Sequence, residues 1–179
     1  NLLKKAQDSV LWLFRSNDLA ERNLKSEAKA RGVEGDRLIF AEHMPKDQHL
    51  ARCRLADLAL DTRICGGHTT TSDFLWAGVP VVTMLGAHFA SRVSASLLNA
   101  VGLQELITHN LEDYEALIFR LSQNPDELDE LTTKLACNRL SEPLFDTPRF
   151  VGNLENAYRR MWENYLSGEQ PSGIDVIEG

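Results

Sequence analysis

The chain has 179 residues, of which 43% are hydrophobic and 25% are charged, as is usual for a globular protein with a buried core. Its formal net charge of −7 argues against nucleic acid and membrane surfaces as partners, since neither attracts an acidic protein, so any anion site must be local. The three cysteines, Cys53, Cys65 and Cys137, show no Cys-x-x-Cys spacing, which argues against a disulfide framework or a zinc site and favours a cytoplasmic location.

Strand and helix patterns alternate as far as Thr108. In chain order, they predict a strand at 9–14, a helix at 19–30, a strand at 37–40, a helix at 45–54, a strand at 58–61, a helix that opens near Thr69, a strand at 78–84, a helix at 89–100 and a short strand at 106–108. This spacing indicates an α/β fold with right-handed βαβ units around a parallel sheet flanked by helices.

The rest of the chain is predicted to be helical, at 111–122, 125–140 and 150–166, with a loop at 141–148. The last helix carries Tyr158, Met161, Trp162 and Tyr165, a pattern more typical of packing against a core than of ligand binding. We expect one domain over residues 1–166, including the helix at 150–166, and a flexible tail at 167–179 with few apolar residues.

The N-terminus has no signal-peptide pattern, and no run approaches the roughly 18 apolar residues of a membrane helix. The sequence opens on Asn1 rather than Met, and residues 2–6 already have the pattern of a helix end. We therefore expect a fragment of a longer protein.

The run Cys65-Gly66-Gly67-His68-Thr69-Thr70-Thr71-Ser72-Asp73 joins the third strand to the next helix. Its glycines allow a tight turn and a close backbone approach, and the free N–H groups at the helix start favour a diphosphate. Asp73 lies four residues after Thr69, so a carboxylate for sugar hydroxyls would share one helix face with the phosphate site. Taken alone, an ordinary glycine turn with a threonine N-cap is the commoner interpretation.

A second set of side chains lies on the helix at 45–54. Lys46, His49 and Arg52 recur every third residue, which places them along one side of that helix. Lysine and arginine supply the charge that a diphosphate needs, although a solvated helix face is the usual interpretation of such a pattern. Both sets follow parallel strands, and ligands bind at the carboxyl edge of such sheets, so the two together favour a diphosphate site.

Other polar side chains are predicted to reach this edge. His68 could donate a hydrogen bond to a phosphate oxygen, and His88 and Arg92 follow the fourth strand. Cys65 could line a sugar pocket or serve as a small hydrophobe. The turn lacks the lysine of a P-loop, and His49 and His68 are not spaced as a pair of ligands, so no metal site is predicted.

Many short segments together resemble the C-terminal catalytic half of O-linked N-acetylglucosamine (O-GlcNAc) transferases, glycosyltransferase family 41, of a bacterial type. The resemblance spans nearly the whole chain and rests on these segments: Lys46-Asp47-Gln48-His49-Leu50-Ala51-Arg52, Leu55-Ala56-Asp57, Leu60-Asp61-Thr62, Gly67-His68-Thr69-Thr70, Asp73, Leu75-Trp76-Ala77-Gly78, Pro80, Val82-Thr83-Met84, Ala90-Ser91-Arg92-Val93, Ser141-Glu142-Pro143-Leu144-Phe145-Asp146-Thr147 and Met161-Trp162-Glu163.

The resemblance implies a glycosyltransferase B (GT-B) architecture, in which two Rossmann-like halves hold a nucleotide sugar between them and this chain is the second half. It implies that Thr69 and Thr70 bind the diphosphate, with His68 beside the nucleotide and Asp73 on the ribose. It implies further that Lys46 and His49 contact the diphosphate and uridine, the lysine stabilising the departing UDP, and that Arg52 assists from the same helix. No metal and no cofactor are implied beyond the donor substrate UDP-N-acetylglucosamine (UDP-GlcNAc).

The implied function is UDP binding in an inverting glycosyltransferase that moves N-acetylglucosamine to Ser and Thr hydroxyls of proteins. The family's first strand of this half, its N-terminal catalytic half and its tetratricopeptide repeats would lie before Asn1, so we expect the chain alone to bind UDP weakly and to be inactive. Thr71 and Ser72 depart from the animal pattern. Two alternatives stay open: a protein O-fucosyltransferase that uses GDP-fucose, and a non-catalytic module that binds a nucleotide sugar or a protein.

Overall fold

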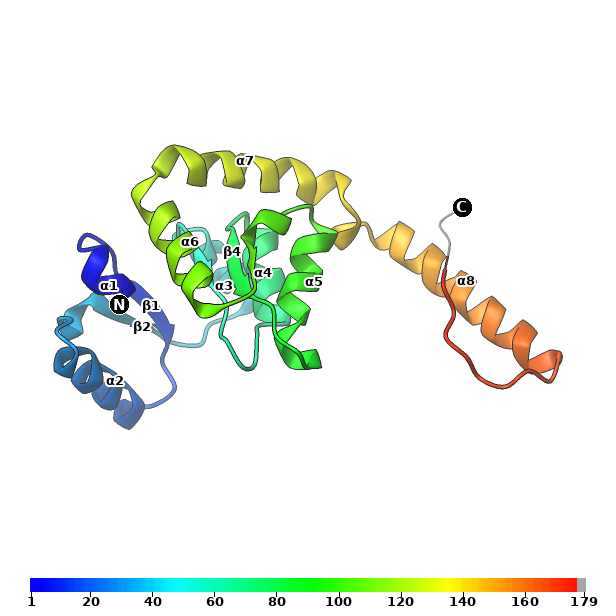
Figure 1. Cartoon of the computed structure of the whole chain (residues 1–179), viewed down its shortest axis with the longest axis horizontal. Coiled ribbons are helices and arrows are strands. Elements are labelled where there is room, and N and C mark those ends of the chain that lie inside the picture. The colour runs from blue at the N-terminus through cyan, green and yellow to red at the C-terminus, as the bar shows by residue number, and fades with distance from the viewer. Residues whose placement is uncertain (177–179) are drawn as a thin grey trace.

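The computed structural model describes residues 1–176, which form parallel sheets flanked by helices (Figure 1). The strands are β1 (Leu11–Phe14), β2 (Leu38–Ala41), β3 (Ala59–Leu60), β4 (Val81–Met84) and β5 (Ile107–Thr108). The α-helices are α1 (Leu2–Lys5), α2 (Asp18–Ala30), α3 (Lys46–Cys53), α4 (Thr69–Ala77), α5 (Val93–Ala100), α6 (Leu111–Gln123), α7 (Pro125–Ser141) and α8 (Thr147–Leu166). Short 3-10 turns occur at η1 (Gly35–Arg37), η2 (Phe89–Ser91), η3 (Gln104–Leu106) and η4 (Pro143–Phe145).

The predicted parallel arrangement is confirmed, but the strands form two sheets. β1 pairs with β2 from Leu11 opposite Leu38 to Phe14 opposite Ala41. β4 pairs with β3 on one edge and with β5 on the other. Among residues 1–176 no strand pairs with the second edge of β1 or of β3, so both edges keep unpaired backbone groups.

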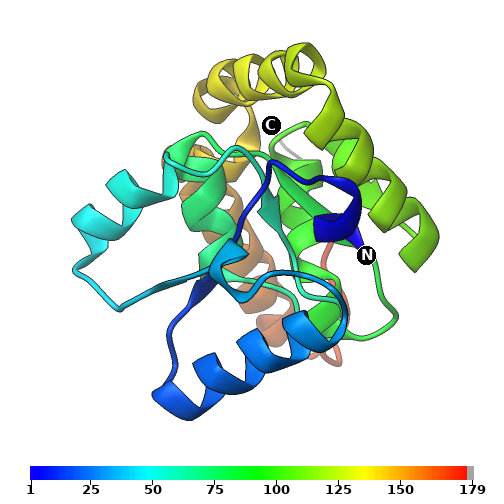
Figure 2. The ribbon, with the colours of Figure 1, turned by 90° about the vertical axis from the view of Figure 1, so that its left-hand side faces the viewer.

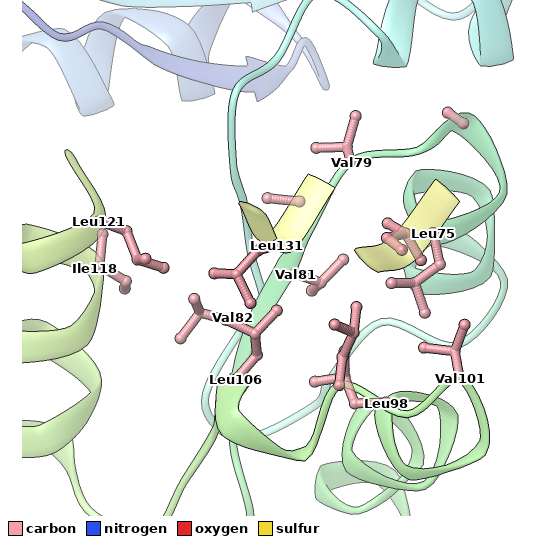
Figure 3. Packing of buried hydrophobic residues seen from close by; sticks show 14 of the residues in the cluster. Leu75, Val79, Val81, Val82, Leu98, Val101, Leu106, Ile118, Leu121 and Leu131 are labelled. Carbon is pink, nitrogen blue, oxygen red and sulfur yellow. The ribbon is translucent and has the colours of Figure 1, made fainter. Parts of the chain in front are cut away.

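The core surrounds β4, which is buried on both faces. Adjacent residues of a strand point to opposite faces, and Val81 and Val82 are both fully buried. Figure 3 shows Leu75 and Leu98 on one side of this strand and Leu121 on the other. Helices α4 and α5 therefore cover one face and α6 covers the second, as a parallel strand requires.

Contacts within the N-terminal segment, residues 1–41, and from this segment to α6 and α3 hold it in place. The Arg37 guanidinium donates to the carbonyls of Leu3 at 2.6 Å, Ala6 at 2.6 Å and Ser9 at 2.9 Å. On α1, Lys5 forms an ion pair of 2.9 Å with Glu115 of α6. The Arg52 guanidinium of α3 lies 5.3 Å from the centre of the Trp12 ring, so α3 is held against β1.

Helix boundaries follow caps and turns that the periodicity alone does not show. The helix predicted at 89–100 is interrupted: η2 precedes α5, because the Gly86 amide bonds the Ser91 carbonyl at 3.0 Å and folds this loop back. The last helix begins at Thr147 rather than at 150, because the Asp146 side chain accepts from the Arg149 amide at 3.1 Å.

The expected packing of the last helix against the core is wrong. Helix α8 extends away from the body of the molecule (Figure 1), and none of its residues is buried. Trp162 is 59% exposed and Tyr165 is 72% exposed. The apolar residues do share one stripe of the helix, but residues 1–176 include no element that covers it.

Helix α7 crosses the top of the body in both ribbon views (Figure 1 and Figure 2). Within residues 1–176, none of the helices is long and apolar enough to cross a membrane. The tail lies along α8, where the Arg160 guanidinium donates to the Asp175 carbonyl at 2.5 Å. The flexibility predicted for 167–179 falls partly outside the described residues.

Replacing Leu75 with alanine tests the importance of the core around β4. Leu75 is 0% exposed, so truncation leaves a cavity and is expected to lower the free energy of unfolding by about 2–5 kcal/mol in urea denaturation. Leu55→Ala is the matched control, because Leu55 is 79% exposed and its loss is expected to change stability by less than about 0.5 kcal/mol. Equal effects of the two substitutions would contradict this description of the core.

Candidate functional site

The Gly66-Gly67 turn after β3 is hydrogen-bonded to the carboxylate of Asp61. The Gly67 amide donates to Asp61 Oδ1 at 2.6 Å, and the Gly66 amide donates to the Ala90 carbonyl at 2.9 Å. A Cβ at Gly66 would lie 2.8 Å from Asp61 Oδ2, and one at Gly67 would lie 2.5 Å from Thr71 Oγ1. Both glycines are therefore needed for close approach, and neither has a positive φ.

Helix α4 begins directly after this turn, at Thr69, with His68 as its N-cap residue. Amide groups of the first helical turn have no partner within the helix, so this end offers free donors and a partial positive charge. Thr69 and Thr70 are exposed, whereas Thr71 is buried and its hydroxyl donates to the Gly67 carbonyl at 3.0 Å. The exposed threonines are thus the ones that a ligand can reach.

Three side chains of α3 and α4 meet beside this helix start. The Lys46 ammonium forms an ion pair with Asp73 Oδ1, and His49 Nε2 lies 3.7 Å from Asp73 Oδ2. His49 lies three positions after Lys46 on α3, and Asp73 lies one turn after Thr69 on α4. The predicted candidates therefore gather where α3 packs against α4.

Arg52 faces the same cluster from further along α3. Its Nη2 lies 3.3 Å from His49 Nδ1, and its Nη1 donates to the Glu42 carbonyl at 2.8 Å. Together with the contact to Trp12, these bonds fix the guanidinium next to His49. The ring of His68, the N-cap residue of α4, lies edge-on to that of Phe89, at 5.8 Å between centroids.

The ion pair between Lys46 and Asp73 is weak enough for an anionic ligand to replace Asp73. The Lys46 side chain is 57% exposed and that of Asp73 is 14% exposed. An ion pair with such exposure contributes about 0–1 kcal/mol, so an anionic ligand can replace Asp73 at the ammonium with little loss. The site thus combines an available cation, free amide donors and a carboxylate.

The two cysteines near the site differ in exposure. Cys53 is buried with its Sγ 3.6 Å from His49 Nε2, and burial together with the Asp73 carboxylate raises the pKa of the Cys53 thiol. A protonated, enclosed thiol packs as a small hydrophobe and is a poor nucleophile. Cys65 is exposed on the turn. Within the described part of the chain, no group of three or more His, Cys, Asp or Glu is arranged to hold a metal ion.

The sequence did not predict that Asp61, Thr83 and Ser94 hold the turn in place. Asp61 and Thr83 stand at the ends of β3 and β4, and the Thr83 hydroxyl donates to Asp61 Oδ2 at 2.6 Å. Ser94 of α5 donates to the Gly67 carbonyl at 2.8 Å. An aspartate that directly follows an apolar strand, five residues before a pair of glycines, is the signal that could have identified Asp61, whereas Ser94 gave no local signal.

Comparison with known proteins gives a consistent result. Residues 1–154 match the sequence model described as glycosyl transferase family 41. The chain is 44% identical over 179 residues to the probable UDP-N-acetylglucosamine–peptide N-acetylglucosaminyltransferase SEC of Arabidopsis thaliana, covering 99% of this chain and 18% of that protein. It is 36% identical over 167 residues to the Caenorhabditis elegans UDP-N-acetylglucosamine–peptide N-acetylglucosaminyltransferase, covering 93% of this chain and 14% of that protein.

A solved structure extends the similarity to the fold. A mutant O-GlcNAc transferase of Thermobaculum terrenum superposes with a TM-score of 0.85 at 36% sequence identity, covering 91% of this chain and 32% of that chain. This chain therefore spans 18% and 14% of the two curated relatives above, and a larger but still minor share of the solved structure.

Gly67→Ala tests whether the turn depends on close approach. The added methyl would meet Thr71 Oγ1 at 2.5 Å and the Thr71 amide at 3.3 Å, so we expect the free energy of unfolding to fall by about 1–3 kcal/mol in urea. Gly152→Ala is the matched control: a Cβ at this α8 position meets nothing within 4 Å, so stability should stay at or above that of the original chain. A Gly67→Ala chain as stable as the control would contradict the geometry.

Proposed function

The chain belongs to glycosyl transferase family 41, and from that membership we propose that it forms the UDP-binding wall of an inverting glycosyltransferase. The parallel sheets flanked by helices match an O-GlcNAc transferase structure, consistent with one half of a GT-B fold. The proposed reaction moves N-acetylglucosamine from UDP-GlcNAc to Ser and Thr hydroxyls of proteins. One observation carries this proposal: Lys46 and His49 meet Asp73 beside the free amides at the start of α4.

Each group has a distinct role in the proposed complex. The amides and hydroxyls of Thr69 and Thr70 would bind the diphosphate, because a helix N-terminus favours phosphate oxygens. Lys46 would leave Asp73 and bind the diphosphate, which frees the Asp73 carboxylate to accept hydrogen bonds from ribose hydroxyls. His68 would stand beside the nucleotide, and His49 would contact the diphosphate and uridine. Arg52 would add positive charge through its contact with His49.

The chemistry follows from the charge that develops on the leaving group. The acceptor hydroxyl oxygen attacks the anomeric carbon from the face opposite UDP, the bond from this carbon to the β-phosphate oxygen breaks, and UDP leaves with the electron pair. The Lys46 ammonium would stabilise that developing charge, which is usually a large contribution to catalysis. The proton of the acceptor hydroxyl passes to a general base.

The proposal also includes protein segments outside this chain, the cellular location and the macromolecular partner. The curated relatives are several times longer, so we propose that a preceding catalytic half closes the cleft and that tetratricopeptide repeats outside this chain recruit protein acceptors. The three free cysteines support a cytoplasmic location. The net charge of −7 supports protein rather than nucleic acid or membrane as the macromolecular partner.

Nucleotide preference separates this proposal from the fucosyltransferase alternative. We expect calorimetric titration of the chain to give weak UDP binding, since only one wall of the cleft is present, and a GDP affinity lower by about tenfold or more. Asp73→Ala should weaken UDP binding, because it removes the carboxylate proposed to hold the ribose. Tighter binding of GDP than of UDP would favour the alternative.

Lys46→Ala separates an enzyme from a non-catalytic binding module. In a protein that joins this chain to a catalytic N-terminal half, we expect transfer from UDP-GlcNAc to an acceptor peptide to fall by about 10²–10³-fold, because the leaving diphosphate loses its cation. Lys134→Ala is the control. Lys134 lies on α7 and pairs with Glu105 of η3 at 2.6 Å, so its replacement should leave transfer unchanged. Transfer that survives Lys46→Ala, or that is absent before the substitution, would contradict the catalytic role.

A further inference from the structure

Asp61 accepts three hydrogen bonds from neutral donors at the carboxyl end of β3. Its Oδ1 accepts from the Gly67 amide at 2.6 Å and from the Thr62 amide at 3.0 Å. Its Oδ2 accepts from the Thr83 hydroxyl at 2.6 Å. Hydrogen bonds to a carboxylate are about twice as strong as those between neutral groups, so this side chain is a firm attachment point for the turn.

The Gly67 residue is held on its other side as well. Its carbonyl accepts from the Thr71 hydroxyl at 3.0 Å and from the Ser94 hydroxyl at 2.8 Å. In a trans peptide the carbonyl and the following N–H point in opposite directions, and the described residues contain no cis peptide bond. Because the Gly67 carbonyl points to the buried hydroxyls, the His68 amide points away from them.

Asp61 is itself fixed through its backbone. Its amide donates to the Val82 carbonyl at 3.0 Å, and its carbonyl accepts from the Tyr114 hydroxyl of α6 at 2.7 Å. Burial raises the pKa of Tyr114, so this hydroxyl stays protonated and remains a donor. The amide bond to Val82 makes Asp61 a continuation of the sheet, and the carboxylate is held by its own three hydrogen bonds, so the Tyr114 bond is not needed to hold the turn.

A carboxylate at this place has an electrostatic cost if the neighbouring ligand is an anion. A neutral acceptor would avoid repulsion of a diphosphate, but it would hold the Gly67 amide less tightly. The glycine turn packs closely against the Asp61 carboxylate, because a Cβ on Gly66 would lie only 2.8 Å from Oδ2. We therefore expect the stronger hold on the Gly67 amide to matter more for this site than the repulsion between the carboxylate and an anionic ligand.

We propose that Asp61 is a positioning residue that sets diphosphate affinity through Gly67, by holding the turn so that the amides of His68, Thr69 and Thr70 face the ligand. This inference rests on the proposed function for the identity of the ligand. Asp61 has no direct contact with the nucleotide in this arrangement; its charge strengthens the bond to the Gly67 amide and repels an anionic ligand, two effects on affinity that oppose each other. What is required is an acceptor oxygen at the position of Oδ1.

Three variants separate these properties. Asp61→Ala removes the acceptor. Asp61→Asn keeps an oxygen for the Gly67 and Thr62 amides and places its NH₂ toward the Thr83 hydroxyl, which can rotate to accept, so shape is kept while charge is lost. Tyr114→Phe is the matched control, because it removes a hydrogen bond to the Asp61 carbonyl and leaves the carboxylate with the turn.

Two measurements on the chain are made for each variant: UDP affinity by calorimetry, and amide hydrogen exchange of residues 66–71. We expect Asp61→Ala to weaken UDP binding by about tenfold or more and to accelerate exchange in the turn. Asp61→Asn and Tyr114→Phe should stay within about threefold of the original affinity. Exchange in the turn should be unchanged in Tyr114→Phe, and it should accelerate less in Asp61→Asn than in Asp61→Ala. Unchanged UDP affinity in Asp61→Ala, or an equal loss in Asp61→Asn, would overturn the inference.

Two further outcomes keep the test decisive. If Asp61→Ala does not fold, Asp61→Glu replaces it: the charge is kept but the oxygens move by one methylene, so UDP binding should still weaken, and unchanged binding would overturn the inference. If the original chain binds no UDP, the proposed function fails by itself. The exchange data then decide whether Asp61 positions the turn, because faster exchange in Asp61→Ala than in Tyr114→Phe would support that role and equal exchange would overturn it.

Discussion

Burial of β4 on both faces is the constraint on which the rest of the structure depends. Val81 and Val82 point in opposite directions and are both enclosed, so the strand needs a helical layer on each side. Helix α4 is part of one layer, and its packing fixes where its first residue, Thr69, can begin. The connection from β3 to α4, residues 61–68, then brings the glycine turn to the edge where β3 and β4 end. The position of the site is thus a consequence of how the core is covered.

Local pattern predicted the elements well and their partners poorly. Apolar periodicity places α2 and α6 within a residue or two of their observed bounds. In the structure the side chains of Asn17 and Asn110 cap these helices by accepting from amides three residues later. The division into two sheets depends on which strands meet, and no local signal carries that information. The same holds for α8: its apolar stripe is visible in the sequence, but whether another element covers the stripe depends on residues far away.

In the candidate site too, features that depend on neighbouring residues of one helix could be predicted, whereas features that depend on residues far apart in the sequence could not. The spacing of Lys46 and His49 along α3 and of Thr69 and Asp73 along α4 follows from helical geometry, so each pair could be assigned to one face from sequence. That α3 brings its pair to Asp73 depends on the packing of α3 against α4, because the strands before these helices, β2 and β3, belong to different sheets. The inward turn of the Thr71 hydroxyl could not be predicted, because it depends on the Gly67 carbonyl and on Ser94 of another helix.

Four charged side chains at the site cancel in pairs, which makes the direction of its hydrogen bonds important. Lys46 and Arg52 bring two positive charges, and Asp61 and Asp73 bring two negative ones. The start of α4 then contributes about half a positive charge that these four side chains do not match. Affinity for a diphosphate at these groups therefore depends on hydrogen bonds that point correctly. Because hydrogen bonds weaken steeply with misalignment, the site depends on the buried contacts that fix its amides.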